Sequence, residues 1–237
     1  MKRLLLTRPE EDSIALRDAL RRIRVESLIT PMLEIENIPG PAISTENLQG
    51  FLVTSANGVR ALAARTDKRE LPMYAVGDAT ARAAMEMGFG AVTSASGDVD
   101  DLATLVKHAC DSADGGFFHA AGTVTAGDLS GQLSEAGFQV IREKIYEAKP
   151  VDTLPYDAAI ALKTRTIQGV VLYSPRTAET FVDRVNKAGL MMMLAHVQLI
   201  ALSQNVRNAA GTTWSGIIVA RQPTQESLLN AVRTCYY

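Results

Sequence analysis

The chain alternates short, continuous apolar runs with stretches in which apolar residues recur at helical spacing. A continuous apolar run of four to six residues is typical of a strand that is covered on both faces. These runs are Arg3–Leu6, Gly50–Thr54, Met73–Val76, Phe117–Ala120, Val170–Tyr173 and Val197–Leu202. A polar or glycine turn and then a helical pattern follow each run, so the sequence predicts parallel sheets with right-handed crossovers.

The order of these elements occurs twice. Val53–Val59 and Leu172–Ala178 both show a strand end, a serine and a helix start, and the units that follow them also correspond. The corresponding pairs are Met73–Leu105 with Val197–Val232, and Arg3–Glu36 with Phe117–Ala148. We therefore predict a degenerate tandem duplication that gives two similar α/β domains. Extended, proline-flanked segments near Leu33–Asn37 and Arg142–Val151 are natural crossings between them.

Composition narrows the class of protein. The length of 237 residues allows one or two domains, and the net charge of −2 argues against a broad nucleic-acid surface. Two cysteines, Cys110 and Cys235, fit no metal spacing and indicate a reducing compartment. The N-terminal apolar run stops at Arg8, and Gly189–Leu202 is shorter than the about 20 residues that span a bilayer. We expect a cytoplasmic protein without membrane contact.

The turns after the predicted strands carry the candidate binding residues. Ligands of an open parallel sheet lie beyond the carboxyl ends of its strands, where helices begin. Small and hydroxylic residues there leave backbone N–H groups that can bind a carboxylate, although each turn taken singly also fits an ordinary helix cap. The turns are Thr7-Arg8, Ser55–Gly58, Gly77–Thr80, Ala121–Thr123, Ser174–Thr177 and Ser203–Asn205.

The sequence does not contain the common motifs for cofactor binding or catalysis. Gly88-Phe89-Gly90 lacks the third glycine of a dinucleotide loop, and no phosphate-binding loop with lysine occurs. His108, His119 and His196 show no metal-ligand spacing, and we expect each to be an ordinary helix or strand-end residue. Asp98, Asp100 and Asp101 stand at a helix start, where carboxylates cap amides. The sequence thus predicts neither a metal nor another cofactor.

An ordered set of short motifs resembles the uroporphyrinogen-III synthase family over nearly the whole chain. The motifs are Leu4–Pro9, Thr54–Val59, Tyr74–Ala81, Ser96-Gly97, Asp101–Ala103, Ile145–Ala148 and Tyr173–Thr177. The resemblance implies an α/β fold of two similar parallel-sheet (flavodoxin-like) domains, joined by a two-stranded linker and with a cleft between them. Domain 1 would comprise residues 1–35 plus 150–237 and domain 2 residues 38–147, with linker strands at 33–38 and 142–151.

The resemblance also implies an activity. Such an enzyme is a lyase of haem biosynthesis that cyclises hydroxymethylbilane to uroporphyrinogen III, with loss of water and inversion of ring D. It uses no cofactor, receives the linear tetrapyrrole from the preceding enzyme of the pathway, and is expected to be a monomer. Tyr146 matches the family tyrosine near the linker and is the candidate for assisting departure of the hydroxyl group.

The expected substrate-binding residues lie in the turns described above. They are Arg8, Ser55, Asn57, Gly58, Gly77, Thr80, Gly97, Gly122, Ser174, Arg176, Thr177 and Ser203. One turn departs from the family pattern, because Ser203-Gln204-Asn205 stands where family members commonly have a glycine followed by small residues and threonine. If a threonine hydroxyl of that turn contacts the substrate in the family, Asn205 takes its place here or the contact is absent.

Two other functions fit part of the pattern. A non-catalytic two-domain sensor could bind a small anion between its domains, which the lack of strong acid–base or metal residues favours. It would be expected to carry a DNA-binding or regulatory segment, and the two modules use up the chain. A nucleotide-dependent transferase would need a glycine-rich first turn, and Thr7-Arg8-Pro9 is not one.

Overall fold

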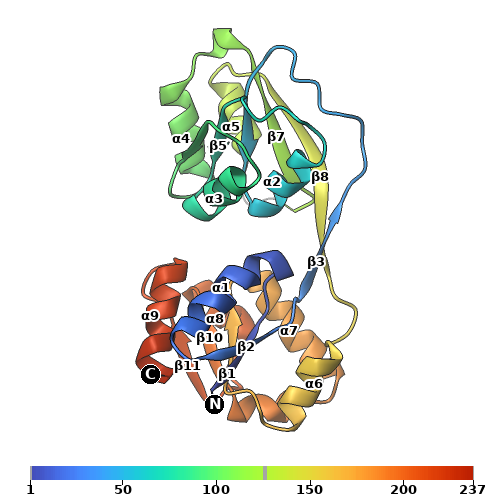
Figure 1. Cartoon of the computed structure of the whole chain (residues 1–237), viewed down its shortest axis with the longest axis vertical. Coiled ribbons are helices and arrows are strands. Elements are labelled where there is room, and N and C mark those ends of the chain that lie inside the picture. Colours follow the sequence, from blue (N-terminus) through green and yellow to red (C-terminus); the bar gives the residue numbers. More distant parts are fainter. Residues whose placement is uncertain (1, 125–126, 237) are drawn as a thin grey trace. The chain divides into compact units, whose positions relative to one another are not determined.

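The computed structural model describes residues 2–124 and 127–236. Its contacts divide the chain into two compact units, unit 1 (Met1–Glu34 with Lys149–Tyr237) and unit 2 (Ile35–Ala148). The chain passes between the units within strands β3 (Leu33–Asn37) and β8 (Val140–Pro150). Each unit is built around a sheet of mainly parallel strands with helices beside it (Figure 1), so the predicted α/β fold with two parallel sheets is confirmed.

Unit 1 contains a five-stranded sheet in the order β11-β10-β9-β1-β2, and all of its neighbours pair in parallel. Its strands are β1 (Arg3–Leu6), β2 (Glu26–Ile29), β9 (Gly169–Leu172), β10 (Gln198–Ala201) and β11 (Gly216–Val219). Its helices are α1 (Glu10–Arg22), α6 (Tyr156–Lys163), α7 (Pro175–Lys187), the 3₁₀ segment η2 (Met191–His196), α8 (Gln204–Ala210) and α9 (Gln225–Tyr236).

Apolar cores cover both faces of this sheet because successive strand residues point to opposite sides. Leu5 and Val170 pack on one face in the cluster that contains Phe181 of α7. Leu4 and Val171 pack on the other face, in the cluster with the buried leucines of α1 and α9. Burial on both faces explains why the strands are continuous apolar runs in the sequence.

Unit 2 contains the order β3-β8-β7-β4-β5-β6. Besides β3 and β8, its strands are β4 (Leu48–Val53), β5 (Met73–Ala75), β6 (Val92–Ser94) and β7 (Gly116–Gly122), and its helices are α2 (Ala56–Ala63), α3 (Asp78–Glu86), α4 (Val99–Ala109), the 3₁₀ turn η1 (Ser112–Asp114) and α5 (Leu129–Glu135). The core beside α2 and α3 contains Phe51 and Ala120. The core beside α4 and α5 contains Leu52 and Phe117.

The two units share one strand order. Numbered from β1, unit 1 reads 2-1-3-4-5, the flavodoxin-like order. Unit 2 has the same order in five of its six strands when its numbering starts at β7, and β3 is added at the edge beside β8. Strands β4, β5 and β6 therefore correspond to β9, β10 and β11, while β7 and β8 correspond to β1 and β2. These are the pairs that the internal repeat predicted.

The edge strand β2 was not among the predicted strands. It begins with Glu26 and Ser27 and none of its residues is fully buried, so it has no continuous apolar run. Its place is set by parallel pairing with β1, where Arg3 lies opposite Glu26. No helix among residues 2–124 and 127–236 combines the length and apolar character that crossing a membrane requires.

Candidate functional site

Each unit has a point in its sheet where the strand order reverses. In the 2-1-3-4-5 order it lies between the first and third strands, and ligands of such sheets bind beyond the carboxyl ends there. In unit 1 these strands are β1 and β9, and in unit 2 they are β7 and β4. The turns that leave these four strands contain most of the predicted site residues.

In unit 2, Tyr146 lies against the turn that leaves β4. Its hydroxyl donates a hydrogen bond to Ser55 Oγ at 3.1 Å, although 91 positions separate the two residues. Ser55 is the N-cap of α2, and its Oγ accepts the amides of Asn57 at 3.0 Å and Gly58 at 3.4 Å. The side-chain oxygen of Asn57 in turn accepts from Arg60 Nη1 at 2.8 Å. The phenol is thus connected through one hydroxyl to the start of a helix.

A β-bulge sets the direction of Tyr146. The parallel register of β7 and β8 shifts between Ala121 and Gly122, so that Gly122 lies opposite Tyr146. Ile145 and Tyr146 are consecutive, and yet both are buried in the core beside α2 and α3. A regular strand would send them to opposite faces, and a bulge is the usual way to re-aim a side chain near a site.

Two glycines make room for this arrangement. A Cβ added at Gly122 would lie 2.8 Å from Cζ and 2.9 Å from Oη of Tyr146. A Cβ at Gly58 would lie 2.8 Å from the carbonyl oxygen of Ala120 and 3.5 Å from Cε1 of Tyr146. Both distances of 2.8 Å are shorter than any normal carbon contact. The glycines therefore allow the tyrosine ring and the start of α2 to approach the end of β7.

In unit 1, Arg8 occupies the turn after β1. Its Nη2 pairs with Asp12 Oδ2 at 3.0 Å, and its Cζ lies 4.7 Å from the ring centroid of Tyr173, the residue after β9. Burial raises the pKa of Tyr173 to about 12, and the neighbouring Arg8 charge opposes that rise. The guanidinium is held by stacking and by one carboxylate, while its side chain keeps 24% of its surface exposed.

The turn after β9 starts α7. Ser174 is the N-cap, and its Oγ accepts the Thr177 amide at 3.1 Å and lies 2.8 Å from Thr177 Oγ1. Pro175 follows at the first helical position, where a missing amide costs nothing. Arg176 is partly buried at the second helical position, and Thr177 is almost fully buried. The turn therefore offers a neutral cap and one cationic side chain.

The helix starts differ in whether their first turn contains an acidic residue, whose negative charge would repel the carboxylates of the expected ligand. The first turns of α2, α7 and α8 contain no acidic residue, and hydroxyls cap them; in α8 the cap is Ser203, which accepts the Val206 amide at 3.4 Å. A neutral cap leaves the positive end of the helix dipole available to an anion. These three starts follow β4, β9 and β10.

The starts of α3 and α4 carry the chain's own acidic residues, and at α4 these carboxylates cap the helix as the sequence predicted. Asp98 accepts the amides of Asp100 and Asp101, and Asp101 accepts the Asp98 amide, which completes a capping box. Gly97 is needed there because a Cβ would lie 1.9 Å from Asp101 Oδ2. At α3, Asp78 accepts the hydroxyls of Ser94 and Ser96 at 2.7 Å each, and these bonds lower its pKa.

The structure thus sorts the predicted residues into three groups. Tyr146, Ser55, Asn57, Gly58 and Gly122 come together in unit 2. Arg8, Ser174, Arg176, Thr177 and Ser203 lie on neighbouring turns of unit 1. The remaining three, Gly77, Thr80 and Gly97, lie at helix starts that carry the chain's own carboxylates, and the Thr80 side chain is buried.

Sequence reasoning missed Tyr173 and His119. Only the stacking of Arg8 on its ring identifies Tyr173 as part of the candidate site. The expectation that His119 is an ordinary strand-end residue is wrong, because it lies in the middle of β7 and lines a cavity. A polar residue inside the buried run Phe117–Ala121 was the available signal. Among the described residues no group of three or more His, Cys, Asp or Glu side chains could hold a metal ion.

Solved structures with a similar fold are known. A mutant uroporphyrinogen III synthase from the extremely thermophilic bacterium Thermus thermophilus is 17% identical, with 99% of each chain covered and a TM-score of 0.53. The uroporphyrinogen-III synthetase from Helicobacter pylori 26695 is 13% identical, with 99% of this chain and 100% of that chain covered and a TM-score of 0.64. At such identities the likeness concerns the fold.

No curated protein matches the sequence. The sequence does match the family described as Uroporphyrinogen-III synthase HemD over residues 14–230, which is nearly the whole chain. The chain belongs to the uroporphyrinogen-III synthase family.

Proposed function

We propose that this protein catalyses the cyclisation of hydroxymethylbilane to uroporphyrinogen III, with loss of water and inversion of ring D. Family membership supports the reaction class. The observation that carries the proposal is the Tyr146–Ser55 hydrogen bond, built by a bulge and two glycines at the reversal point of unit 2. The bulge, Gly58 and Gly122 all serve to place this one phenol, and a tyrosine that only packs in a core does not need them.

The proposed role of Tyr146 is to donate a proton to the departing hydroxyl group. The C–O bond of the hydroxymethyl group breaks, the oxygen leaves as water, and the phenol oxygen is left with negative charge. That charge would lie beside Ser55, whose hydroxyl can rotate to donate to it, and near the start of α2, whose first turn has no acidic residue. The proton returns to the phenolate when the ring closes and the last pyrrole carbon is deprotonated.

Binding would use the neutral helix starts and the cationic side chains. The substrate bears acetate and propionate arms on every pyrrole, so it needs several anion sites. The starts of α2, α7 and α8, together with Arg8 and Arg176, supply such sites. Positioning is expected to dominate the rate advantage, because the linear substrate also cyclises unaided without inverting ring D.

The test is an isomer assay with hydroxymethylbilane. We expect the purified protein to give the type III isomer, and Tyr146→Phe to slow its formation so that the type I isomer from the unaided reaction dominates. Tyr156→Phe is a matched control, because Tyr156 is 77% exposed in α6. Type I product alone from the unmodified protein would refute the proposal. Tight binding of uroporphyrinogen III without turnover would favour the anion-binding sensor instead.

We further propose that the protein acts as a cytoplasmic monomer that receives its substrate from the preceding enzyme of the pathway. The two units repeat one sheet order within a single chain, so one chain supplies both reversal points. Sedimentation at the concentration of the assay would test the monomer. A dimer that loses activity on dilution would contradict it.

A further inference from the structure

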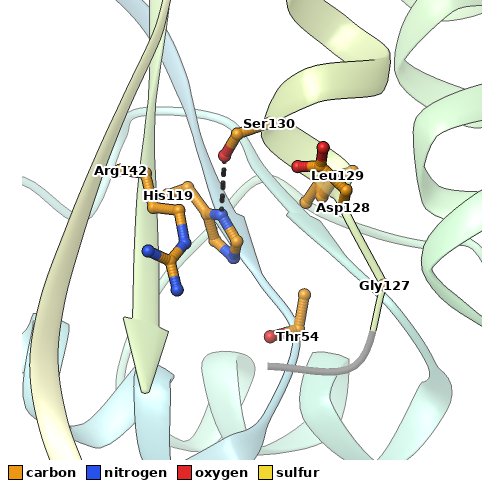
Figure 2. Close-up of a pocket in the computed structure, with 7 residues that line it drawn as sticks. All are labelled: Thr54, His119, Gly127, Asp128, Leu129, Ser130 and Arg142. Atoms are coloured by element: carbon orange, nitrogen blue, oxygen red, sulfur yellow. Dashed lines mark hydrogen bonds between the residues drawn. The ribbon is translucent and has the colours of Figure 1, made fainter. Parts of the chain in front are cut away.

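Unit 2 contains a cavity that the proposed mechanism does not use. Its volume is about 350 Å³, within the lower range of small-molecule sites. Thr54 after β4, His119 of β7 and Arg142 of β8 line it, together with Asp128 and Ser130 at the start of α5 (Figure 2). It adjoins the core of the sheet face that carries α4 and α5, whereas Tyr146 packs in the core beside α2 and α3.

His119 presents an unsatisfied nitrogen to this cavity. The side chain is 3% exposed, and its Nδ1 lies 3.3 Å from Ser130 Oγ. Its Nε2 is buried and has no hydrogen-bond partner in the described part of the chain. Figure 2 shows this second nitrogen turned toward Thr54 and away from Ser130. A buried polar atom without a partner costs stability and calls for an explanation.

Arg142 lies next to this histidine. The register of β7 and β8 places His119 opposite Arg142, and the guanidinium lies beside the imidazole in Figure 2. The Arg142 side chain belongs to an exposed residue and forms no ion pair with any described residue. Burial, and then the Arg142 charge, lower the pKa of His119 to about 4, so the imidazole is neutral near pH 7.

These groups form a donor set for one negative charge. When Ser130 donates to Nδ1, the neutral imidazole carries its proton on Nε2 and donates into the cavity. Arg142 adds a forked cationic donor that matches the two oxygens of a carboxylate. The wall also contains Asp128, whose carboxylate accepts the Gly131 amide at 2.9 Å. That negative charge disfavours a dianion such as phosphate.

We propose that the His119–Arg142 cavity binds a carboxylate group, with one oxygen on His119 Nε2 and the other on the Arg142 guanidinium. The volume accommodates a carboxylate on a short alkyl chain. The group can come from a free organic acid or from an acid arm of the tetrapyrrole, and the second source rests on the proposed function. Thr54 of the cavity wall supports this second source, because it directly precedes Ser55, the partner of Tyr146.

The first experiment uses propionate as the probe, with the full-length protein labelled with ¹⁵N-histidine. We expect a saturable shift of the His119 imidazole signals on titration with propionate, and a smaller response to phosphate at equal concentration. Arg142→Gln should weaken propionate binding about tenfold or more, since it removes a charged hydrogen bond. Lys107→Gln is the matched control, because it removes one positive charge from an exposed residue of α4 in the same unit.

No saturable shift at His119 with propionate would overturn the proposal, as would unchanged affinity in the Arg142→Gln protein. Arg142→Lys is a second variant if Arg142→Gln folds poorly, and it should also weaken propionate binding because it removes the forked donor. Competition separates the two sources: displacement of propionate by uroporphyrinogen III identifies a tetrapyrrole arm, and simultaneous binding identifies a free acid. Propionate binding does not depend on turnover, so the isomer assay can fail while this proposal stands, and the reverse also holds.

Discussion

Replacement of Gly122 by alanine tests the arrangement around Tyr146 most directly. The new Cβ would lie 2.8 Å from Cζ of the tyrosine, whereas non-bonded carbon atoms in van der Waals contact are about 3.5 Å or more apart. The ring must therefore move by roughly 0.7 Å or more, the difference between these two distances. The backbone of Gly122 is not in the left-handed region, so alanine itself adopts it without strain.

A displacement of this size affects activity more than stability. The Tyr146–Ser55 bond is 3.1 Å long, and a shift of about 1 Å off its present line breaks it. Misplacing a reacting group by that much lowers the rate on the order of 100-fold. Overpacking costs about 1–3 kcal/mol, of which the alanine recovers part through the unfolded chain. We expect a net loss of about 1–2 kcal/mol and a melting temperature lower by a few degrees.

The assay is the rate of uroporphyrinogen III formation, measured beside thermal unfolding. Gly90→Ala is the control, because a Cβ at Gly90 has no heavy atom within 4 Å. If Gly122 acts through the tyrosine, adding Tyr146→Phe to Gly122→Ala should cause little further loss. A Gly122→Ala protein that forms the type III isomer at the unmodified rate would refute the reasoning, and so would additive losses in the double variant.

The remaining predictions concern stability. Asp98→Ala should lower the free energy of unfolding by about 1 kcal/mol and leave turnover unchanged, because the carboxylate caps α4 and lies outside the proposed catalytic set; urea titration and the isomer assay check both halves. The folded protein holds the Tyr173 proton more tightly than the unfolded chain, since its pKa rises from 10 to about 12. The free energy of unfolding should therefore fall between pH 10 and 12, by up to about 1.4 kcal/mol per pH unit from this group, and Tyr173→Phe should flatten the fall. His119 has the opposite sense: its pKa drops from 6.5 to about 4, so stability should decrease as pH falls from 6.5 toward 4, and His119→Gln should reduce that decrease. An unchanged pH profile in either variant would contradict its assigned role.

The sheets could be predicted from the sequence because their strands are buried on both faces. Phe117–Ala121 is buried throughout and apolar except at His119, and Val170–Leu172 is apolar without interruption; such runs identify a strand without knowledge of its neighbours. Edge strands lack this signal. β2 exposes Glu26, and its position depends on pairing with β1, from which α1 separates it in the sequence.

Contacts inside the candidate site depended on register, which local sequence does not encode. Tyr146 and Ser55 meet only because β8 pairs with β7 through a bulge and β7 pairs with β4. Without the bulge, alternation would place Tyr146 on the face opposite Ile145. For the same reason the sequence could not show that His119 and Arg142 are neighbours, or that Asp101 fills the space beside Gly97.

The repeated strand order explains how one chain holds two different sets of groups. The turn with Ser55 corresponds to the turn with Ser174, and both start a helix with a serine cap and no acidic residue in the first turn. Beside these equivalent helix starts the units differ. Unit 2 places a buried phenol there, and unit 1 places the Arg8 guanidinium on Tyr173. The proposed proton donor and the proposed carboxylate binder therefore stand beside corresponding turns of one sheet design. On this basis, loss of Tyr146 or of Arg8 removes a group that the other unit does not duplicate.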